Sequence, residues 1–252
     1  MSTSPSRAVS VLTIAGSDSG GGAGIQADLK TFAAHRVHGL SAIAALTAQH
    51  TRGVTAVHAP PVAFLRAQID ACFDDFDIRA VKIGMLATAE IVDAVVDALA
   101  RHPELPIVVD PVMIATSGAK LLDDNALGAL RGRLIPRAHV LTPNLPEAEL
   151  LLGRAIDGGA AADAALTALR ALGAQGVLLK GGHLNEGDEV VDRYADAAAA
   201  FTHRAPRLEI DGHGTGCTLS SAIAARLALG DDGAAACRAG IAYVHRAMRD
   251  AY

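Results

Sequence analysis

The chain has 252 residues, of which 51% are hydrophobic and 19% are charged, and its formal net charge is −5. This length suits one large domain or two small ones with a sizeable core. The negative charge argues against nucleic acid as the main partner, and no apolar run reaches the ~20 residues that a membrane-spanning helix needs. The three cysteines form no CxxC pair, which argues against a disulfide framework and a structural zinc site.

Short apolar runs alternate with helical patterns along the chain. Strands are predicted at 9–14, 39–46, 80–83, 107–109, 140–142 and 176–180, and helices at 25–35, 62–73, 89–100, 126–134, 147–152 and 161–172. A hairpin is predicted at 189–194 and 198–206, and two helices at 215–229 and 233–248 close the chain. Continuous apolar strands that alternate with helices predict an α/β fold, with a mostly parallel sheet between two layers of helices.

No linker-like segment interrupts this pattern, so we expect a flexible tail at 1–7 and a single domain at 8–252. The apolar stretch at 8–15 has the length of a signal-peptide core, but it leads into a glycine cluster and suits a buried strand better. A cytoplasmic location follows from that interpretation.

The glycine cluster, Gly20-Gly21-Gly22, follows the first predicted strand and precedes a helix. The pattern Gly22-x-Gly24-x-x-Ala27 matches a dinucleotide-binding fingerprint, but the acidic residue expected about 20 positions further on is missing. A plain tight turn would also explain the cluster. Three consecutive glycines exceed what a turn needs, so we predict a ligand close to this backbone.

Other candidate residues follow later strands, and ligands in such sheets bind at the carboxyl ends of the strands. Met85 is either core filling or one wall of a flat heterocycle site. Asp110 is a candidate ion or hydroxyl ligand. Asn144 is either a helix cap or, with Glu147, a partner of a magnesium–phosphate group.

Lys180 ends the strand at 176–180, where it is either a phosphate ligand or an exposed loop residue. The GxxxxGK[ST] motif is absent from the whole chain, so a kinase with this sequence would not be a P-loop kinase.

The most informative segment runs from His213 to Thr218 and precedes a long apolar helix pattern. Gly214 and Gly216 allow a ligand to approach the backbone, and the N–H groups of the following helix predict an anion hole. Cys217 lies at the helix start, where the pKa of a thiol is expected to fall. An anion site that holds a potential base is typical of phosphoryl transfer.

These segments together resemble the hydroxymethylpyrimidine/phosphomethylpyrimidine kinases of thiamine biosynthesis, within the ribokinase-like superfamily. The matching stretches are 15–32, 45–49, 82–85, 110–113, 141–147, 180–183 and 213–218, and the resemblance spans residues 9 to about 245. It implies ATP-dependent phosphorylation of 4-amino-5-hydroxymethyl-2-methylpyrimidine and then of its monophosphate. It also implies Mg²⁺ as a cofactor and a homodimer.

The resemblance also assigns roles to residues of this chain. The substrate pocket would comprise Gly16, Ala23, Gln49, Met85 and Val112. Asp28, in the helix after the glycine cluster, is a further candidate for substrate binding, or else a residue of a solvated helix face. The anion hole would comprise Gly214, Thr215, Gly216 and Cys217, with Cys217 as the base. Lys180, Asn144 and Glu147 would serve the phosphates, and Asp110 and Glu147 would serve the metal through phosphates or water.

The chain departs from common family patterns at His50, Thr116 and Gly212. The main rival is a pyridoxine/pyridoxal kinase on the same scaffold, whose substrate is a ring of similar size with a hydroxymethyl group. Two hypotheses from different classes are an NAD-binding oxidoreductase and a non-catalytic pyrimidine-binding module. The missing ribose-binding acid counts against the oxidoreductase, and the Gly-Thr-Gly-Cys segment counts against the binding module.

Overall fold

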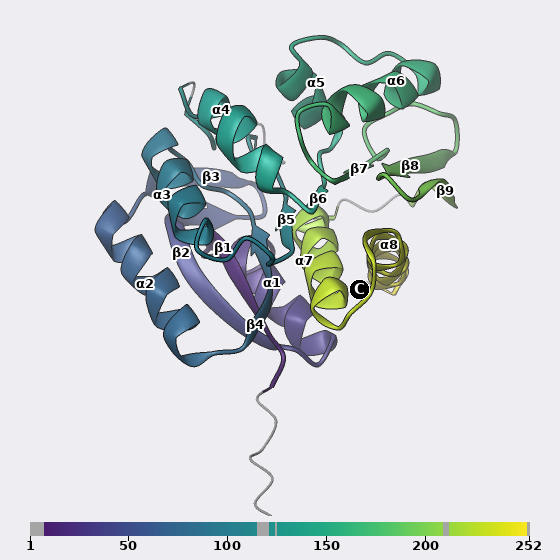
Figure 1. The fold of residues 1–252 in the computed structure, drawn as a ribbon. Coiled ribbons are helices and arrows are strands. Elements are labelled where there is room, and N and C mark those ends of the chain that lie inside the picture. The colour runs from purple at the N-terminus through teal and green to yellow at the C-terminus, as the bar shows by residue number, and fades with distance from the viewer. Residues whose placement is uncertain (1–7, 115–120, 124, 209–211, 251–252) are drawn as a thin grey trace, which may run out of the picture.

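A computed structural model describes residues 8–114, 121–123, 125–208 and 212–250, whose path is shown in Figure 1. The predicted tail at 1–7 and Thr116 lie outside the described residues. The described strands form one nine-stranded sheet in the order β3-β2-β1-β4-β5-β6-β7-β8-β9. One continuous sheet is compatible with a single domain over 8–252, which stays a prediction.

The sheet is parallel in its centre and antiparallel at both edges. Its strands are β1 Ser10–Asp18, β2 His38–His50, β3 Gly53–His58, β4 Ile78–Ile83, β5 Ile107–Val109, β6 Val140–Leu141, β7 Gly176–Leu179, β8 Glu189–Ala195 and β9 Ala200–Pro206. The run β2-β1-β4-β5-β6-β7 is parallel, whereas β3, β8 and β9 pair antiparallel with their neighbours. The predicted α/β class with a mostly parallel sheet is confirmed.

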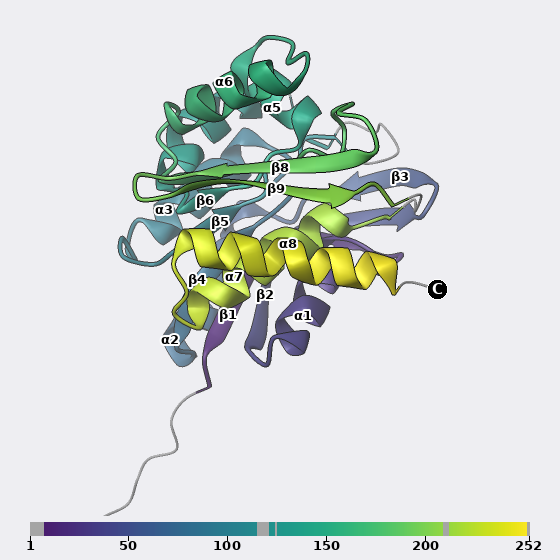
Figure 2. The ribbon, with the colours of Figure 1, turned by 90° about the vertical axis from the view of Figure 1, so that its right-hand side faces the viewer.

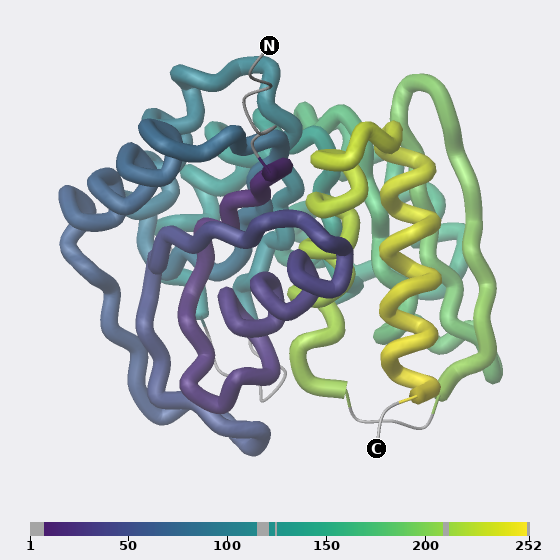
Figure 3. Tube along the Cα trace, turned by 90° about the horizontal axis from the view of Figure 1, so that it is seen from below, coloured from purple at the N-terminus to yellow at the C-terminus, as the bar shows by residue number. Residues whose placement is uncertain are grey.

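Helices cover both faces of the sheet. They are α1 Gly24–Ala34, α2 Val62–Asp75, α3 Ala89–Leu99, α4 Ala126–Ala129, the π-helical turn η1 Leu130–Leu134, the 3₁₀ turn η2 Ile135–Arg137, α5 Leu145–Leu152, α6 Gly159–Arg170, α7 Thr215–Ala228 and α8 Gly233–Arg249. Figure 2 shows α8 running next to the β8–β9 hairpin, and Figure 3 shows α1, α7 and α8 side by side on one face.

The central strands are buried on both sides, as their continuous apolar sequences predict. In β1, Val11 packs into the core beneath α1, α7 and α8, whereas its neighbours Leu12 and Ile14 pack into the core beneath α2 to α6. Successive side chains of a strand point to opposite faces, so an unbroken apolar run supplies both cores. No helix among the described residues is both long and apolar enough to cross a membrane.

The sequence prediction misses one strand and misjudges one helix. β2 continues to His50 instead of ending at residue 46, because its last residues pair with β3. The residues of β3 are exposed or only partly buried, so this strand lacks the apolar run that marks the central strands. The helix predicted at 126–134 divides into α4 and η1.

Candidate active site

The amino-terminal end of α7 lies directly against the glycine loop, defined here as residues 18–24. Gly214 precedes the first residue of α7 and has a φ of +83°. A Cβ at this position would lie only 1.8 Å from the carbonyl oxygen of Gly22. Only glycine fits this contact. The first turn of α7, whose N–H groups have no partner within the helix, is thereby placed beside the glycine loop.

Asp18 holds the glycine loop in shape. Its Oδ1 accepts a hydrogen bond from the N–H of Gly20 at 2.8 Å, and its Oδ2 accepts from the N–H groups of Ala23 at 2.8 Å and Gly22 at 3.1 Å. Burial raises the pKa of this carboxyl, but these N–H groups and His213 outweigh burial and lower it overall. The loop therefore closes around a buried carboxylate.

His213 connects the glycine loop to the end of β2. Its Nε2 lies 3.2 Å from Oδ2 of Asp18 and 3.2 Å from the side-chain nitrogen of Gln49. The side-chain oxygen of Gln49 lies 3.1 Å from Oγ1 of Thr47. The predicted pocket glutamine is thus brought to the same place as the glycine loop and the start of α7. His50, the neighbouring departure from the family pattern, is exposed at the turn into β3.

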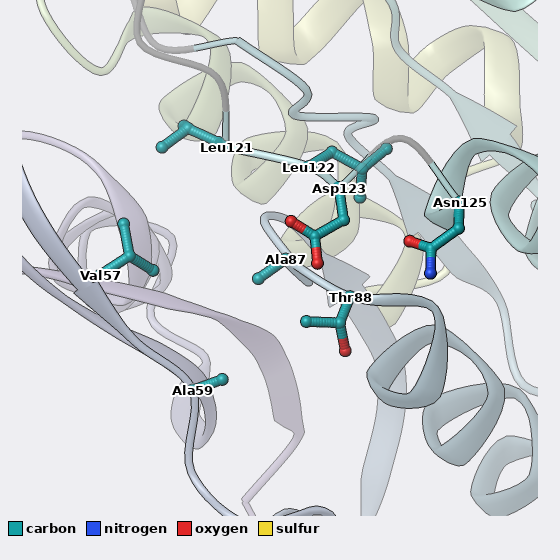
Figure 4. A pocket seen from close by; sticks show the side chains of 8 residues that line it. All are labelled: Val57, Ala59, Ala87, Thr88, Leu121, Leu122, Asp123 and Asn125. Carbon is teal, nitrogen blue, oxygen red and sulfur yellow. The ribbon is translucent and has the colours of Figure 1, made fainter.

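Met85 and Val112, both predicted to line the substrate pocket, belong to one small apolar cluster. This cluster contains Ala45, Met85 and Ala87, with Val112 and Leu121 packed against it. Gly16 adjoins it, since a Cβ there would lie 3.1 Å from the sulfur of Met85. Ala87 and Leu121 also line a cavity of about 580 Å³, shown in Figure 4. The cavity thus adjoins the apolar cluster, although Gly16, Met85 and Val112 do not themselves line it.

Asp28, a predicted substrate-binding residue, lies in the interior of the protein. Its side chain is fully buried, and its carboxylate accepts hydrogen bonds from Thr13 at 2.6 Å and Ser221 at 2.7 Å. Lys82 donates to both of its oxygens at 3.0 Å. Buried charges need such partners. Asp28 therefore supports the site from behind, by tying α1 to β4 and α7.

Lys180 and Asp110 form an ion pair at the start of α7. The Nζ of Lys180 lies 3.0 Å from Oδ1 of Asp110. A Cβ at Gly216 would lie 3.2 Å from Nζ and 3.8 Å from Oδ2 of Asp110, so the pair lies against the first turn of the helix. The carboxyl of Asp110 is buried, and Lys180 and Lys82 nevertheless lower its pKa. The predicted phosphate ligand and the predicted metal ligand are thus adjacent.

Asn144 and Glu147 form a capping box at the start of α5. The Asn144 side chain accepts from the N–H of Glu147 at 2.9 Å, and the Glu147 carboxylate accepts from the N–H of Asn144 at 2.8 Å. Oε2 of Glu147 also lies 3.8 Å from Nζ of Lys180. Burial raises the pKa of Glu147 to about 7. The helix-cap interpretation of Asn144 is confirmed, and the cap also brings Glu147 to Lys180.

These carboxylates fit a magnesium ion that is held mainly by phosphate. Asp110 is 2% exposed and Glu147 is 4% exposed, and Lys180 lies between them. No cluster of three or more His, Cys, Asp or Glu side chains with metal-binding geometry occurs in the part of the chain that the structure describes. One or two carboxylates plus substrate phosphates are the usual surroundings of Mg²⁺. The donor set therefore suits an ion that arrives with a nucleotide.

The pKa of Cys217 differs from the sequence prediction. The thiol is partly buried at the start of α7, and burial raises its pKa to about 11, aided by Asp28 and Asp110. Lys82 and the N–H of Gly24 lower the pKa but do not outweigh burial. The helix start therefore does not make Cys217 a thiolate in the ligand-free protein.

Three residues of this region are missing from the sequence-based set of site residues. Asp18 and His213 have no role in that set, although an aspartate before three glycines is a signal for side-chain bonds to loop N–H groups. Lys82 is fully buried beneath the site. The sequence feature that could have identified it is a charged residue within an otherwise apolar strand. Sequence position alone does not show which partners neutralise it.

The fold and the site define a class of protein. A mostly parallel α/β sheet places the start of α7, a lysine–carboxylate group and an apolar cluster at one sheet edge, and the sequence contains no P-loop motif. This is the arrangement of a small-molecule kinase.

Comparisons with known proteins give the family. The family model described as phosphomethylpyrimidine kinase matches residues 18–252. A hydroxymethylpyrimidine/phosphomethylpyrimidine kinase from Rhizobium meliloti (strain 1021) is 52% identical over 239 residues, which are 94% of this chain and 89% of the relative. The chain belongs to the phosphomethylpyrimidine kinase family, and the resemblance seen in the sequence is confirmed.

Solved structures agree with this assignment. The crystal structure of phosphomethylpyrimidine kinase from Clostridium difficile 630 has a TM-score of 0.84 at 42% identity, covering 94% of this chain and 98% of that chain. The pyridoxal kinase from Staphylococcus aureus, solved in complex with AMP-PCP and pyridoxal, has a TM-score of 0.87 at 32% identity, covering 96% and 88%. The expected rival is thus a structural neighbour at lower identity.

Proposed function

We propose that this chain transfers the γ-phosphoryl group of ATP to the hydroxymethyl oxygen of 4-amino-5-hydroxymethyl-2-methylpyrimidine, and then to the phosphate of the resulting monoester. The observation that carries this proposal is the position of the Gln49 amide and the Lys180–Asp110 pair, which both adjoin the residues around the start of α7. The first can recognise an aminopyrimidine, and the second can hold a phosphate chain.

The pyrimidine side of the site consists of Gln49 and the apolar cluster around Met85. A side-chain amide offers one donor and one acceptor side by side, which matches a ring nitrogen next to an exocyclic amine. Met85 and Val112 provide an apolar wall for the ring. Gly16 lacks a side chain where the ring would approach β1, since even a Cβ there would contact Met85.

The phosphate side consists of the start of α7 and Lys180. The N–H groups of residues 215–217 and the helix dipole would bind the transferring phosphoryl group. Lys180 would bind the nucleotide phosphates, and Asp110 and Glu147 would hold a magnesium ion through water and phosphate oxygens. The ion, when bound, offsets the negative charge that the phosphates bring to this acidic chain.

The two transfers differ in what they require of the protein. In the first, the alcohol oxygen bonds to the γ-phosphorus, the bond from that phosphorus to the bridging oxygen of ADP breaks, and the hydroxyl proton must leave. We assign that proton to Cys217, whose thiol must first give up its own proton, because burial keeps it protonated in the ligand-free protein. In the second, a phosphate oxygen of the monoester attacks, and that group is mostly ionised near neutral pH because its second pKa is about 6.

The principal test compares two substrates under identical conditions. We expect kcat/KM, measured from ADP release, to be much higher for the aminopyrimidine alcohol than for pyridoxal. The reverse preference would assign the chain to the pyridoxal kinase activity of its structural neighbour. A cytoplasmic location and a homodimer are further parts of this proposal, and light scattering in solution measures the second.

A further inference from the structure

The main chain and the side chain of Gln49 are held by different neighbours. The hydroxyl of Ser19 accepts from the Gln49 N–H and donates to the Gln49 carbonyl, both at 2.8 Å. The side-chain amide instead lies between Thr47 at 3.1 Å and His213 at 3.2 Å. Because the main chain is fixed, the amide can differ only in whether its oxygen or its nitrogen faces His213, with the other end facing Thr47.

The neighbours of His213 determine whether its Nε2 atom carries a proton. This nitrogen lies 3.2 Å from Oδ2 of Asp18, a carboxylate that can only accept hydrogen bonds when ionised. The pKa of Asp18 is lowered, so the carboxylate is ionised at neutral pH. Nε2 must therefore carry a proton, whether the imidazole is neutral or cationic. A protonated Nε2 cannot accept from an amide N–H, so the group of Gln49 that faces it must be the oxygen. The single N–H is then shared between that oxygen and Oδ2 of Asp18, as a three-centre hydrogen bond.

Thr47 leads to the same conclusion from the other side. Its hydroxyl has one proton, which it donates to the carbonyl of Ser17 at 2.9 Å. The hydroxyl then offers Gln49 only lone pairs, and the matching group is the amide N–H. The two ends of an amide are nearly alike in size, so a half-turn exchanges the acceptor and the donor without changing the packing. Rotating the Gln49 amide by 180° therefore satisfies the Thr47 hydroxyl, the His213 N–H and both ends of the amide.

We infer that His213 is a positioning residue that locks the Gln49 amide with its oxygen toward His213 and its nitrogen toward Thr47, and thereby sets which way round an aminopyrimidine ring lies. The locked amide keeps one lone pair and one N–H free for the ligand. The exocyclic amine would then lie on the His213 side, and the acceptor ring nitrogen on the Thr47 side. The ring orientation rests on the proposed function, whereas the lock itself does not.

The hydrogen bond can be tested without substrate. In ¹⁵N-labelled protein, long-range proton–nitrogen correlation spectra distinguish protonated from unprotonated imidazole nitrogens, and the His213→Gln variant identifies the His213 signals by their loss. We expect a protonated Nε2. An unprotonated Nε2, with the proton of a neutral ring on Nδ1, would overturn the inference.

The orientation can be tested with two acceptors, the 4-amino alcohol and its 4-oxo analogue. The analogue replaces the amine by a carbonyl and the acceptor nitrogen by an N–H, so it needs the opposite amide orientation. We expect the amino-over-oxo ratio of kcat/KM to fall by about tenfold or more in His213→Leu, because an unlocked amide can turn to serve either ring. His213→Gln keeps an N–H donor and should retain most of the ratio.

Ser19→Ala is the matched control, since it removes hydrogen bonds to the main chain of Gln49 and none to the amide. Its amino-over-oxo ratio should match that of the wild type. Equal losses for both acceptors in His213→Leu, with the ratio unchanged, would show that His213 only packs there. A wild-type protein that phosphorylates neither acceptor would overturn the proposed function and the ring orientation, whereas the imidazole spectrum would still decide the lock.

Discussion

At the scale of one residue, we expect the rates of the two phosphorylations to depend differently on Cys217. A positioned base accelerates proton removal from an alcohol by about 10²- to 10⁴-fold, whereas the monoester is already ionised and needs none. Cys217→Ala should therefore reduce phosphorylation of the alcohol far more than phosphorylation of the monophosphate. Rates measured separately on the two purified acceptors test this. Equal losses would mean that the thiol shapes the anion hole and accepts no proton.

Gln49 should govern substrate binding more than turnover. Gln49→Leu keeps a side chain of similar size but leaves the polar edge of the pyrimidine without a partner. The loss should be about 1–3 kcal/mol, seen as a higher KM for the alcohol. Steady-state kinetics on the purified variant measure it, and an unchanged KM would return Gln49 to a structural role at the end of β2.

Glu147 should affect both magnesium use and the pH dependence of stability. Burial raises its pKa from 4.5 to about 7, so between these pH values the folded protein holds a proton that the unfolded chain releases. Its contribution to the free energy of unfolding therefore falls as the pH rises from about 5 to 8. In metal-free buffer, Glu147→Gln should gain stability relative to the wild type over this range, as measured by urea unfolding at both ends.

The same substitution should raise the magnesium concentration needed for half-maximal rate, since it removes one carboxylate charge. Asp110 and Lys180 are unchanged in this variant, so a different magnesium requirement from that of the wild type reflects the Glu147 carboxylate. An unchanged magnesium titration would leave Glu147 as a helix cap alone. Parallel pH profiles of stability in the two proteins would contradict the buried-carboxylate argument.

At the scale of elements, the contact between α7 and the glycine loop is the critical one. Gly214→Ala places a methyl group against the Gly22 carbonyl at a positive φ, so α7 must move. Gly230 has a φ of +99°, but a Cβ there would meet no atom within 4 Å, so Gly230→Ala isolates the backbone strain of about 1–3 kcal/mol. Thermal unfolding should show the larger loss for Gly214→Ala, and only that variant should lose activity.

A smaller or equal loss of stability in Gly214→Ala would mean that the loop and the helix adjust to each other freely. The anion hole would then not depend on this contact, and the activity of the variant would survive.

Strands and helices are predicted well where their burial requires a recognisable pattern of apolar residues in the sequence. The central strands and the long helices are found because they pack on one or two apolar cores, as Val11 and Leu12 illustrate. β3 is missed because an edge strand with exposed side chains carries no such pattern. Its absence from the prediction also hides the fact that Gln49 lies inside β2 and not in a loop.

The site is predicted less completely than the fold. Gly214, Cys217, Lys180 and Glu147 are predicted because each follows a strand or lies at the start of a helix, and their roles stay predictions. The burial of Asp28 is not predicted, because burial of a charged residue depends on partners such as Ser221, which is 193 positions away in the chain. Long-range partners of this kind are set by packing and leave no local pattern.

At the scale of the whole molecule, the parallel strands bring distant segments to one edge of the sheet. Residues 18–24 and 212–217 contribute the loop and the helix start. Lys180 and Asp110 follow two central strands, and Gln49 lies near the end of β2, which neighbours β1. The central claim is that this one edge phosphorylates an aminopyrimidine alcohol twice.

The most direct test follows the products themselves. The purified protein is incubated with ATP, Mg²⁺ and 4-amino-5-hydroxymethyl-2-methylpyrimidine, and phosphorus NMR is recorded over time. The account predicts that a monophosphate forms first and is then converted to the diphosphate, with one ADP released at each stage. No phosphorylated pyrimidine, or a monophosphate that accumulates and is never converted even when supplied pure, would contradict it.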